Sequence, residues 1–153
     1  MLTDLGEQPL FELSPPEGVE CYRFTWIRAF APPVVLRLIV LKGGDGTLVI
    51  KVGELPKVPG GANKSVKLIR DEKKSLDQRT VGSFRSYIDL SKLYTIPVYD
   101  DNVGLDGSIW IFEAVSYGKY HIVSRWLPKD GPLRGAGTRL IYLAIGGPLV
   151  PIY

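Results

Sequence analysis

The residues best suited to chemistry lie close together in one stretch, WIFEAVSYGKYHIVSRW, at positions 110–126. It contains the only histidine of the chain, His121, together with Glu113 and Arg125. The turn sequence between its two expected strands suits a three-residue loop ending in a left-handed glycine, and this register places Glu113 directly opposite His121. Arg125 would share their face of the sheet, and the Glu113 carboxylate would raise the pKa of His121. A register shifted by one residue would send the carboxylate and the imidazole to opposite faces.

Two interpretations of this pair are open. In the first, His121 is a general acid or base that Glu113 orients, with Asp106 of the preceding loop as a third member. In the second, which we favour, the pair is a half-exposed cross-strand ion pair that stabilises the fold by about 0.2–1 kcal/mol. No nucleophile stands in a recognisable context; the side chains considered are Ser108, Ser124 and Cys21. The sequence therefore assigns no catalytic residue, and it favours a non-enzymatic role while leaving the alternative open.

The sequence offers little to a metal ion or a cofactor. With one cysteine, Cys21, the chain can form neither an internal disulfide nor a thiolate metal cluster. The acidic residues do not follow the spacing of a calcium-binding loop, and the glycine-rich turns at 43–46 and 59–63 lack the strand-to-helix context of a phosphate loop. We therefore expect neither a metal site nor a cofactor.

Aromatic residues alternate along the expected strands and could form either a core or a ligand platform. Tyr22, Phe24 and Trp26 would share one strand face, and we expect Trp26 and Trp110 to lie in the core. Trp126 stands beside Arg125 at a strand end, where core and surface roles are equally open. The expected binding residues are those of the polar hairpin face and its end: Glu113, His121, Arg125 and Trp126.

Alternating and apolar runs predict strands at 21–30, 34–41 and 47–53, which form a three-strand meander, and a fourth strand at 64–70. The order Ser75-Leu76-Asp77-Gln78 has the form of a capping box and predicts a helix over about 76–91.

The later elements complete the fold. The hairpin at 109–126 follows a polar loop, and a second helix is predicted over 132–145, ended by Gly146 and Gly147. Together the elements predict an α+β fold with an antiparallel sheet of five to six strands and two helices packed on one face. We expect a single domain over 1–153, with 1–18 as an irregular N-terminal lead.

The charge pattern says little about partners. The net charge of +3 comes from 19 basic and 16 acidic residues, whose signs alternate along most of the chain. The most basic stretch, 64–74, suits an exposed strand edge better than a strip that binds phosphates, which disfavours nucleic acid as a partner.

No apolar run approaches the ~20 residues that span a bilayer, and the first residues do not resemble a signal peptide. We expect a cytoplasmic protein. A periplasmic or lipid-anchored one is the alternative, if a leader has been removed.

The stretch 104–144 resembles the C-terminal half of small uncharacterised bacterial proteins with a DGxxWxxE pattern followed by YHxVxRWxP, and 22–38 resembles their first two strands. These proteins have no assigned activity, so the resemblance supports the fold and not a mechanism. The residues of this sequence that match the pattern are Asp106, Trp110, Glu113, Tyr120, His121, Arg125 and Trp126.

The function expected from the sequence is that of a non-enzymatic bacterial interaction protein, immunity-like or inhibitor-like, which binds a protein partner through the polar face of its sheet. The alternative is a small hydrolase or lyase with an acid–base site centred on His121. The oligomeric state is left open.

Overall fold

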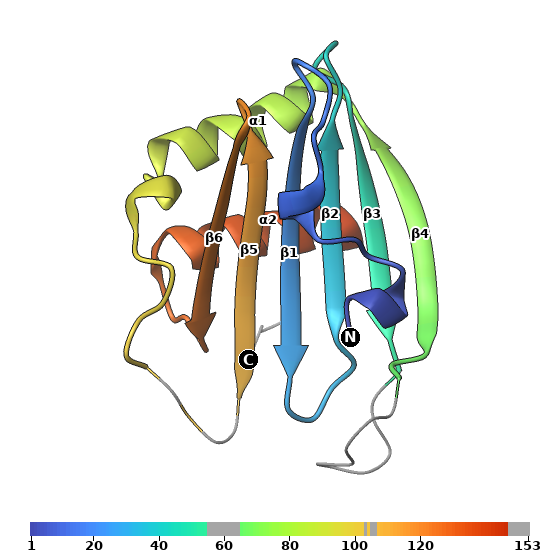
Figure 1. Ribbon diagram of the computed structural model, residues 1–153, viewed down its shortest axis with the longest axis vertical. Coiled ribbons are helices and arrows are strands. Elements are labelled where there is room, and N and C mark those ends of the chain that lie inside the picture. The colour runs from blue at the N-terminus through green and yellow to red at the C-terminus, as the bar shows by residue number, and fades with distance from the viewer. Residues whose placement is uncertain (55–64, 103, 105–106, 147–153) are drawn as a thin grey trace.

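A computed structural model describes residues 1–54, 65–102, 104 and 107–146. They form one open, six-stranded antiparallel sheet in the order β4-β3-β2-β1-β5-β6, with two helices on one face and the N-terminal residues on the other (Figure 1). The strands are β1 (Glu20–Arg28), β2 (Val34–Val40), β3 (Gly46–Gly53), β4 (Leu68–Leu76), β5 (Ser108–Ser116) and β6 (Lys119–Trp126). The helices are α1 (Gln78–Leu90) and α2 (Gly131–Ile145). The predicted α+β fold is confirmed.

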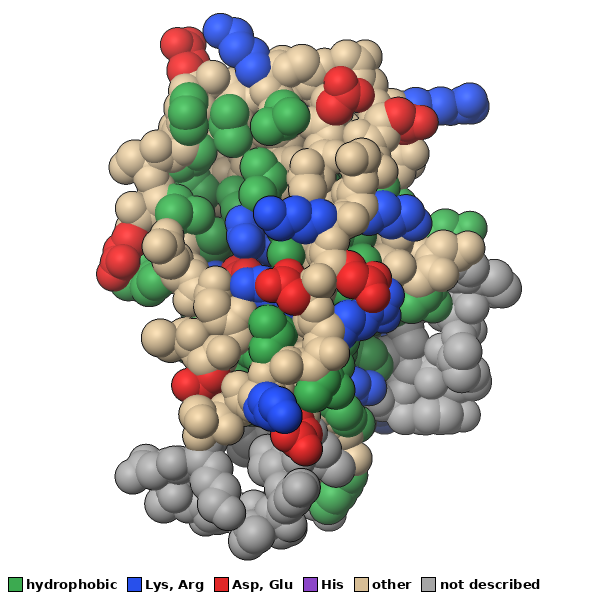
Figure 2. Space-filling model, turned by 90° about the vertical axis from the view of Figure 1, so that its right-hand side faces the viewer, with side chains coloured by type: hydrophobic (Ala, Val, Ile, Leu, Met, Phe, Trp, Pro, Cys, Tyr) green, Lys and Arg blue, Asp and Glu red, His purple; other side chains and the backbone are tan. Residues whose placement is uncertain are grey.

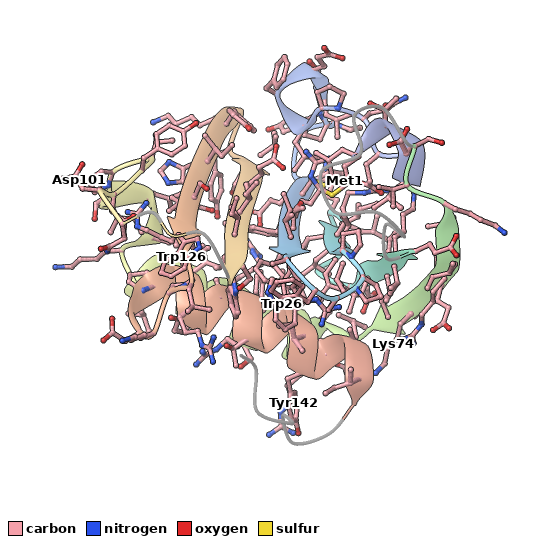
Figure 3. All side chains as sticks on the ribbon, turned by 90° about the horizontal axis from the view of Figure 1, so that it is seen from below. Met1, Trp26, Lys74, Asp101, Trp126 and Tyr142 are labelled. Carbon is pink, nitrogen blue, oxygen red and sulfur yellow. The ribbon has the colours of Figure 1, made fainter. Side chains whose placement is uncertain are left out.

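The core lies between the sheet and the helices. Aromatic side chains of β1 and β5 meet there: the rings of Phe24 and Trp110 are 4.9 Å apart, and those of Trp26 and Trp110 are 5.5 Å apart. The helices contribute Val81, Phe84, Ile88, Leu133, Ala136 and Leu140 to the same cluster. Figure 3, seen from below, shows Trp26 on the side of the sheet that α2 covers. The expected core positions of Trp26 and Trp110 are confirmed.

The start of α1 differs from the predicted capping box. Ser75 belongs to β4, where it pairs with Thr47, so the strand runs to Leu76 and not to residue 70. Asp77 is the N-cap, and its Oδ1 accepts a hydrogen bond from the Thr80 amide at 2.8 Å. The Gln78 side chain donates to the Gly43 carbonyl instead of reaching back to the cap. Pairing with β3 therefore overrides the local capping signal.

β4 is an outer strand of the sheet and carries interleaved charges. Arg70, Asp71, Glu72, Lys73 and Lys74 are all exposed, and Figure 2 shows basic and acidic side chains side by side on this edge. Arg70 pairs with Glu72 at 2.7 Å. The expected exposed edge is confirmed for the described part of 64–74, and such charges discourage pairing with another strand.

The N-terminal segment, residues 1–18, lies across the sheet face opposite the helices (Figure 1). It contains two short 3₁₀ turns, η1 (Thr3–Leu5) and η2 (Leu10–Glu12), and is otherwise irregular. Leu5 and Leu10 are fully buried. The segment therefore forms a thin second cover over the sheet.

The predicted register of the β5–β6 hairpin is wrong by one residue. Tyr117 and Gly118 both have positive φ, 51° and 70°, so the turn has two residues and Ser116 pairs with Lys119. Ala114 then lies opposite His121, and Glu113 lies opposite Ile122. A two-residue turn with left-handed φ at both positions matches the twist of the flanking strands. The shift leaves β5 on its expected faces and moves every side chain of β6 to the other face.

Candidate functional site

The expected pair of Glu113 and His121 does not form. Glu113 projects toward the N-terminal segment, where its Oε2 accepts from Arg23 Nη2 at 2.6 Å and from Nε at 2.7 Å. The Glu113 Oε1 accepts from the Tyr120 hydroxyl at 3.0 Å. His121 projects to the helix side of the sheet, because it shares the face of Ala114. An acid–base site that requires these two side chains together is therefore not present, and Asp106 lies outside the described residues.

His121 holds the chain that follows α1. Its Nε2 lies 3.2 Å from the Leu93 carbonyl oxygen in the turn η3 (Leu93–Thr95), and its ring meets the Tyr94 ring edge-on at 5.2 Å. Partial burial lowers the pKa of His121, although the hydrogen bond to Leu93 acts in the opposite direction. The predicted rise in this pKa is wrong, because the carboxylate that would have caused it faces the other way.

This lowered pKa predicts a loss of stability in acid. The folded protein favours the neutral imidazole. The stability that His121 contributes is therefore complete above its ordinary pKa of 6.5 and is lost as the pH falls from 6.5 to the lower pKa of the folded state. We expect the free energy of unfolding, measured by urea denaturation, to fall less between pH 7.5 and pH 5 in His121→Gln than in the wild type. Equal decreases in the two proteins would contradict a role for His121.

Arg125 also lies on the helix side and attaches a loop to the edge of β6. Its guanidinium donates to the carbonyls of Pro97 at 2.7 Å and Val98 at 3.0 Å, and its Nε lies 3.4 Å from Asp100 Oδ2. The Ser124 amide also donates to the Val98 carbonyl at 2.7 Å. Segment 97–100 therefore follows the outer strand β6, and Arg125 is occupied in holding it.

Trp126 is the expected binding residue that is best placed to meet a partner. It is half-buried and is the last residue of β6, at the lower end of that strand in Figure 1, and its ring lies directly against the backbone of Gly104 and Gly107. A Cβ on Gly104 would come within 2.1 Å of the ring, so only glycine fits there. Trp126 borders a hollow of about 560 Å³ with Arg125 and Lys129, and a second of about 190 Å³ with Tyr99.

A group of apolar side chains that includes Trp126 extends along the hairpin on the sheet face that carries the N-terminal segment. We call it the hairpin patch; its exposed members are Phe11, Tyr99, Ile109 and Tyr120, and its half-buried members are Ile111, Ile122 and Trp126. Phe11 and Tyr99 are 64% and 70% exposed. The rings of Phe11 and Tyr120 meet edge-on at 6.0 Å. The expected pairing of Glu113 with His121 would have turned Tyr120 and Ile122 to the helix side, so the sequence did not predict this patch.

A buried charge cluster lies beside the patch, beneath the N-terminal segment. The Glu7 carboxylate lies 2.9 Å from Arg37, 3.1 Å from Lys51 and 3.5 Å from Arg23. Arg23 also binds Glu113, so two carboxylates and three cations form one cluster. Lys51 donates to the Leu5 carbonyl at 2.7 Å, which attaches the N-terminal segment to β3. Arg37 is the one charged residue of the otherwise apolar strand β2, and its partner Glu7 is 30 residues away in the sequence.

Cys21 lies next to this cluster and is buried. Burial raises the pKa of its thiol to about 11, so the thiolate is scarce at neutral pH. Among the residues that the structure describes, no group of three or more His, Cys, Asp or Glu side chains is arranged to hold a metal ion. Within the same part of the chain, neither helix has the length and apolar character needed to cross a membrane.

No protein-family model matches this chain, and the comparison with curated proteins gave no match.

Proposed function

We propose that this chain is a protein-binding module without enzymatic activity, immunity-like or inhibitor-like, and that the hairpin patch is its contact surface. The observation that carries the proposal is the exposure of Phe11, Tyr99, Ile109 and Tyr120 together on one side of the molecule. Large contiguous exposed apolar patches are uncommon on monomeric proteins and mark interaction sites. Tyrosine, phenylalanine and tryptophan are also enriched where protein partners meet.

The contact surface proposed here differs from the polar face expected at first. Glu113 is buried against Arg23, and Arg125 is occupied by the carbonyls of segment 97–100. Their charges are therefore used inside the fold. Trp126 remains, and with Tyr99 and Ile109 it borders the hollow of about 190 Å³, which has room for an apolar side chain of a partner.

A double variant, Tyr99→Asp with Ile109→Asp, tests this function. Both side chains are exposed, so we expect the folded state to persist while partner binding weakens by about thirtyfold or more, the effect of losing a hot spot of ~2 kcal/mol. The measurement begins with capture of a partner by the immobilised wild-type protein from cells that express it. Isothermal titration of the purified partner against each variant then gives the affinities.

The matched control is Ile69→Asp, which changes an isoleucine 56% exposed on the opposite edge of the sheet. We expect this variant to bind the partner as tightly as the wild type. Equal binding by the double variant and the wild type would refute the hairpin patch as the contact surface.

A further inference from the structure

The two helices leave a groove between them on the side of the molecule opposite the hairpin patch. It has a volume of about 520 Å³, within the range of sites for small organic molecules. Its lining comes equally from both helices: Arg79, Thr80, Ser83 and Phe84 of α1, and Thr138, Arg139, Tyr142 and Leu143 of α2. Residues three and four apart on a helix share a face, which is why these side chains converge.

The chemistry of the groove combines an apolar floor with a basic, hydroxyl-bearing rim. Phe84 belongs to the hydrophobic core, and Leu143 is partly buried against that core. The hydroxyl groups of Thr80, Ser83, Thr138 and Tyr142 can donate or accept hydrogen bonds. Among the described residues of the lining, the charged ones are Arg79 and Arg139, so this part of the groove is complementary to an anion.

Arg139 is held in place at the rim of the groove. Its guanidinium carbon lies 3.5 Å from the centroid of the Tyr87 ring, and its Nη1 donates to the Gly135 carbonyl at 3.3 Å. A guanidinium has five N–H donors, so it can bind an anion while one of them bonds the Gly135 carbonyl. Ordering such a side chain in advance reduces the entropy lost when a ligand binds. Arg79, across the groove, is exposed.

We propose that this groove binds a small organic anion, a carboxylate that carries an apolar chain. The carboxylate lies between Arg79 and Arg139, where a bidentate contact with a guanidinium is strong. The chain lies over Phe84 and Leu143. This site is separate from the hairpin patch and does not depend on the proposed partner binding.

Octanoate and octanamide are suitable probes because they share a chain and differ in charge. Isothermal titration with the full-length protein is expected to show saturable binding of one octanoate, with octanamide weaker by about tenfold or more. In the double variant Arg79→Gln with Arg139→Gln, octanoate affinity is expected to fall about tenfold, to the level of octanamide. Arg70→Gln is the control, because it removes a positive charge on the distant edge strand β4. This variant is expected to bind octanoate as the wild type does.

A groove-filling variant, Thr138→Phe, tests the location without changing charge. Thr138 is half-buried in the groove wall, and the added ring is expected to abolish binding of both probes while circular dichroism shows an unchanged fold. The proposal would be overturned by equal affinities for octanoate and octanamide or by the absence of saturable octanoate binding. Undiminished binding in the double arginine variant or in Thr138→Phe would also overturn it.

Discussion

Replacing Arg23 with Met is expected to lower the free energy of unfolding by about 3–5 kcal/mol, the loss that follows when one partner of a buried ion pair is removed. The Arg23 side chain is 1% exposed, and its guanidinium binds Glu113 at 2.6 Å and the Gln8 carbonyl at 2.7 Å. Methionine fills a similar volume, so the main effect is that Glu113 remains buried without its cation. Urea denaturation at pH 7 measures the change.

Two comparisons separate this cause from others. Arg70→Met removes an arginine from an exposed ion pair with Glu72 and is expected to change stability by less than about 1 kcal/mol. The double variant Arg23→Met with Glu113→Leu removes both buried charges of the pair and is expected to be more stable than Arg23→Met alone. A double variant no more stable than the single one would show that lost packing, and not an unpaired carboxylate, causes the effect.

Alanine at Gly137 is expected to destabilise the protein by about 1–3 kcal/mol, although alanine is normally the better helix former. A Cβ at this position of α2 would lie 2.7 Å from Trp110 Cζ3 and 2.8 Å from Phe24 Cε2. These rings are buried in the core, so relief requires the helix to move away from the sheet. Thermal and urea unfolding monitored by circular dichroism measure the effect.

Gly82 of α1 provides the opposite case. A Cβ there meets no atom within 4 Å, so Gly82→Ala should gain helix propensity and raise stability by about 0.5–1 kcal/mol. The two substitutions are chemically identical and both lie within helices. If Gly137→Ala were as stabilising as Gly82→Ala, the close contact between α2 and the aromatic side chains of the sheet would be disproved.

The hairpin was only partly predictable from the sequence. The hairpin itself was predictable, because the alternation in 110–126 and the Tyr117-Gly118 turn are local signals. The number of residues in that turn was not, because loops of two or three residues fit the same letters and differ by one step in register. Contacts with distant residues favour the observed register: Tyr120 lies on the face of Glu113 and donates its hydroxyl to that carboxylate, while His121 lies on the helix side against the Leu93 carbonyl.

Periodicity and turn composition alone determined the α+β class, the three-strand meander, the helix side of β1 and the charged edge at β4, since each depends on neighbours within a few residues of the chain. Only the tertiary structure decided the faces of β6, the covering of the sheet by the N-terminal segment and the exposure of the hairpin patch. Glu7 meets Lys51 and Arg37, and Arg23 meets Glu113, across long separations in sequence. The energy of such contacts depends on which strands become neighbours, and a one-dimensional pattern of residue types does not contain that information.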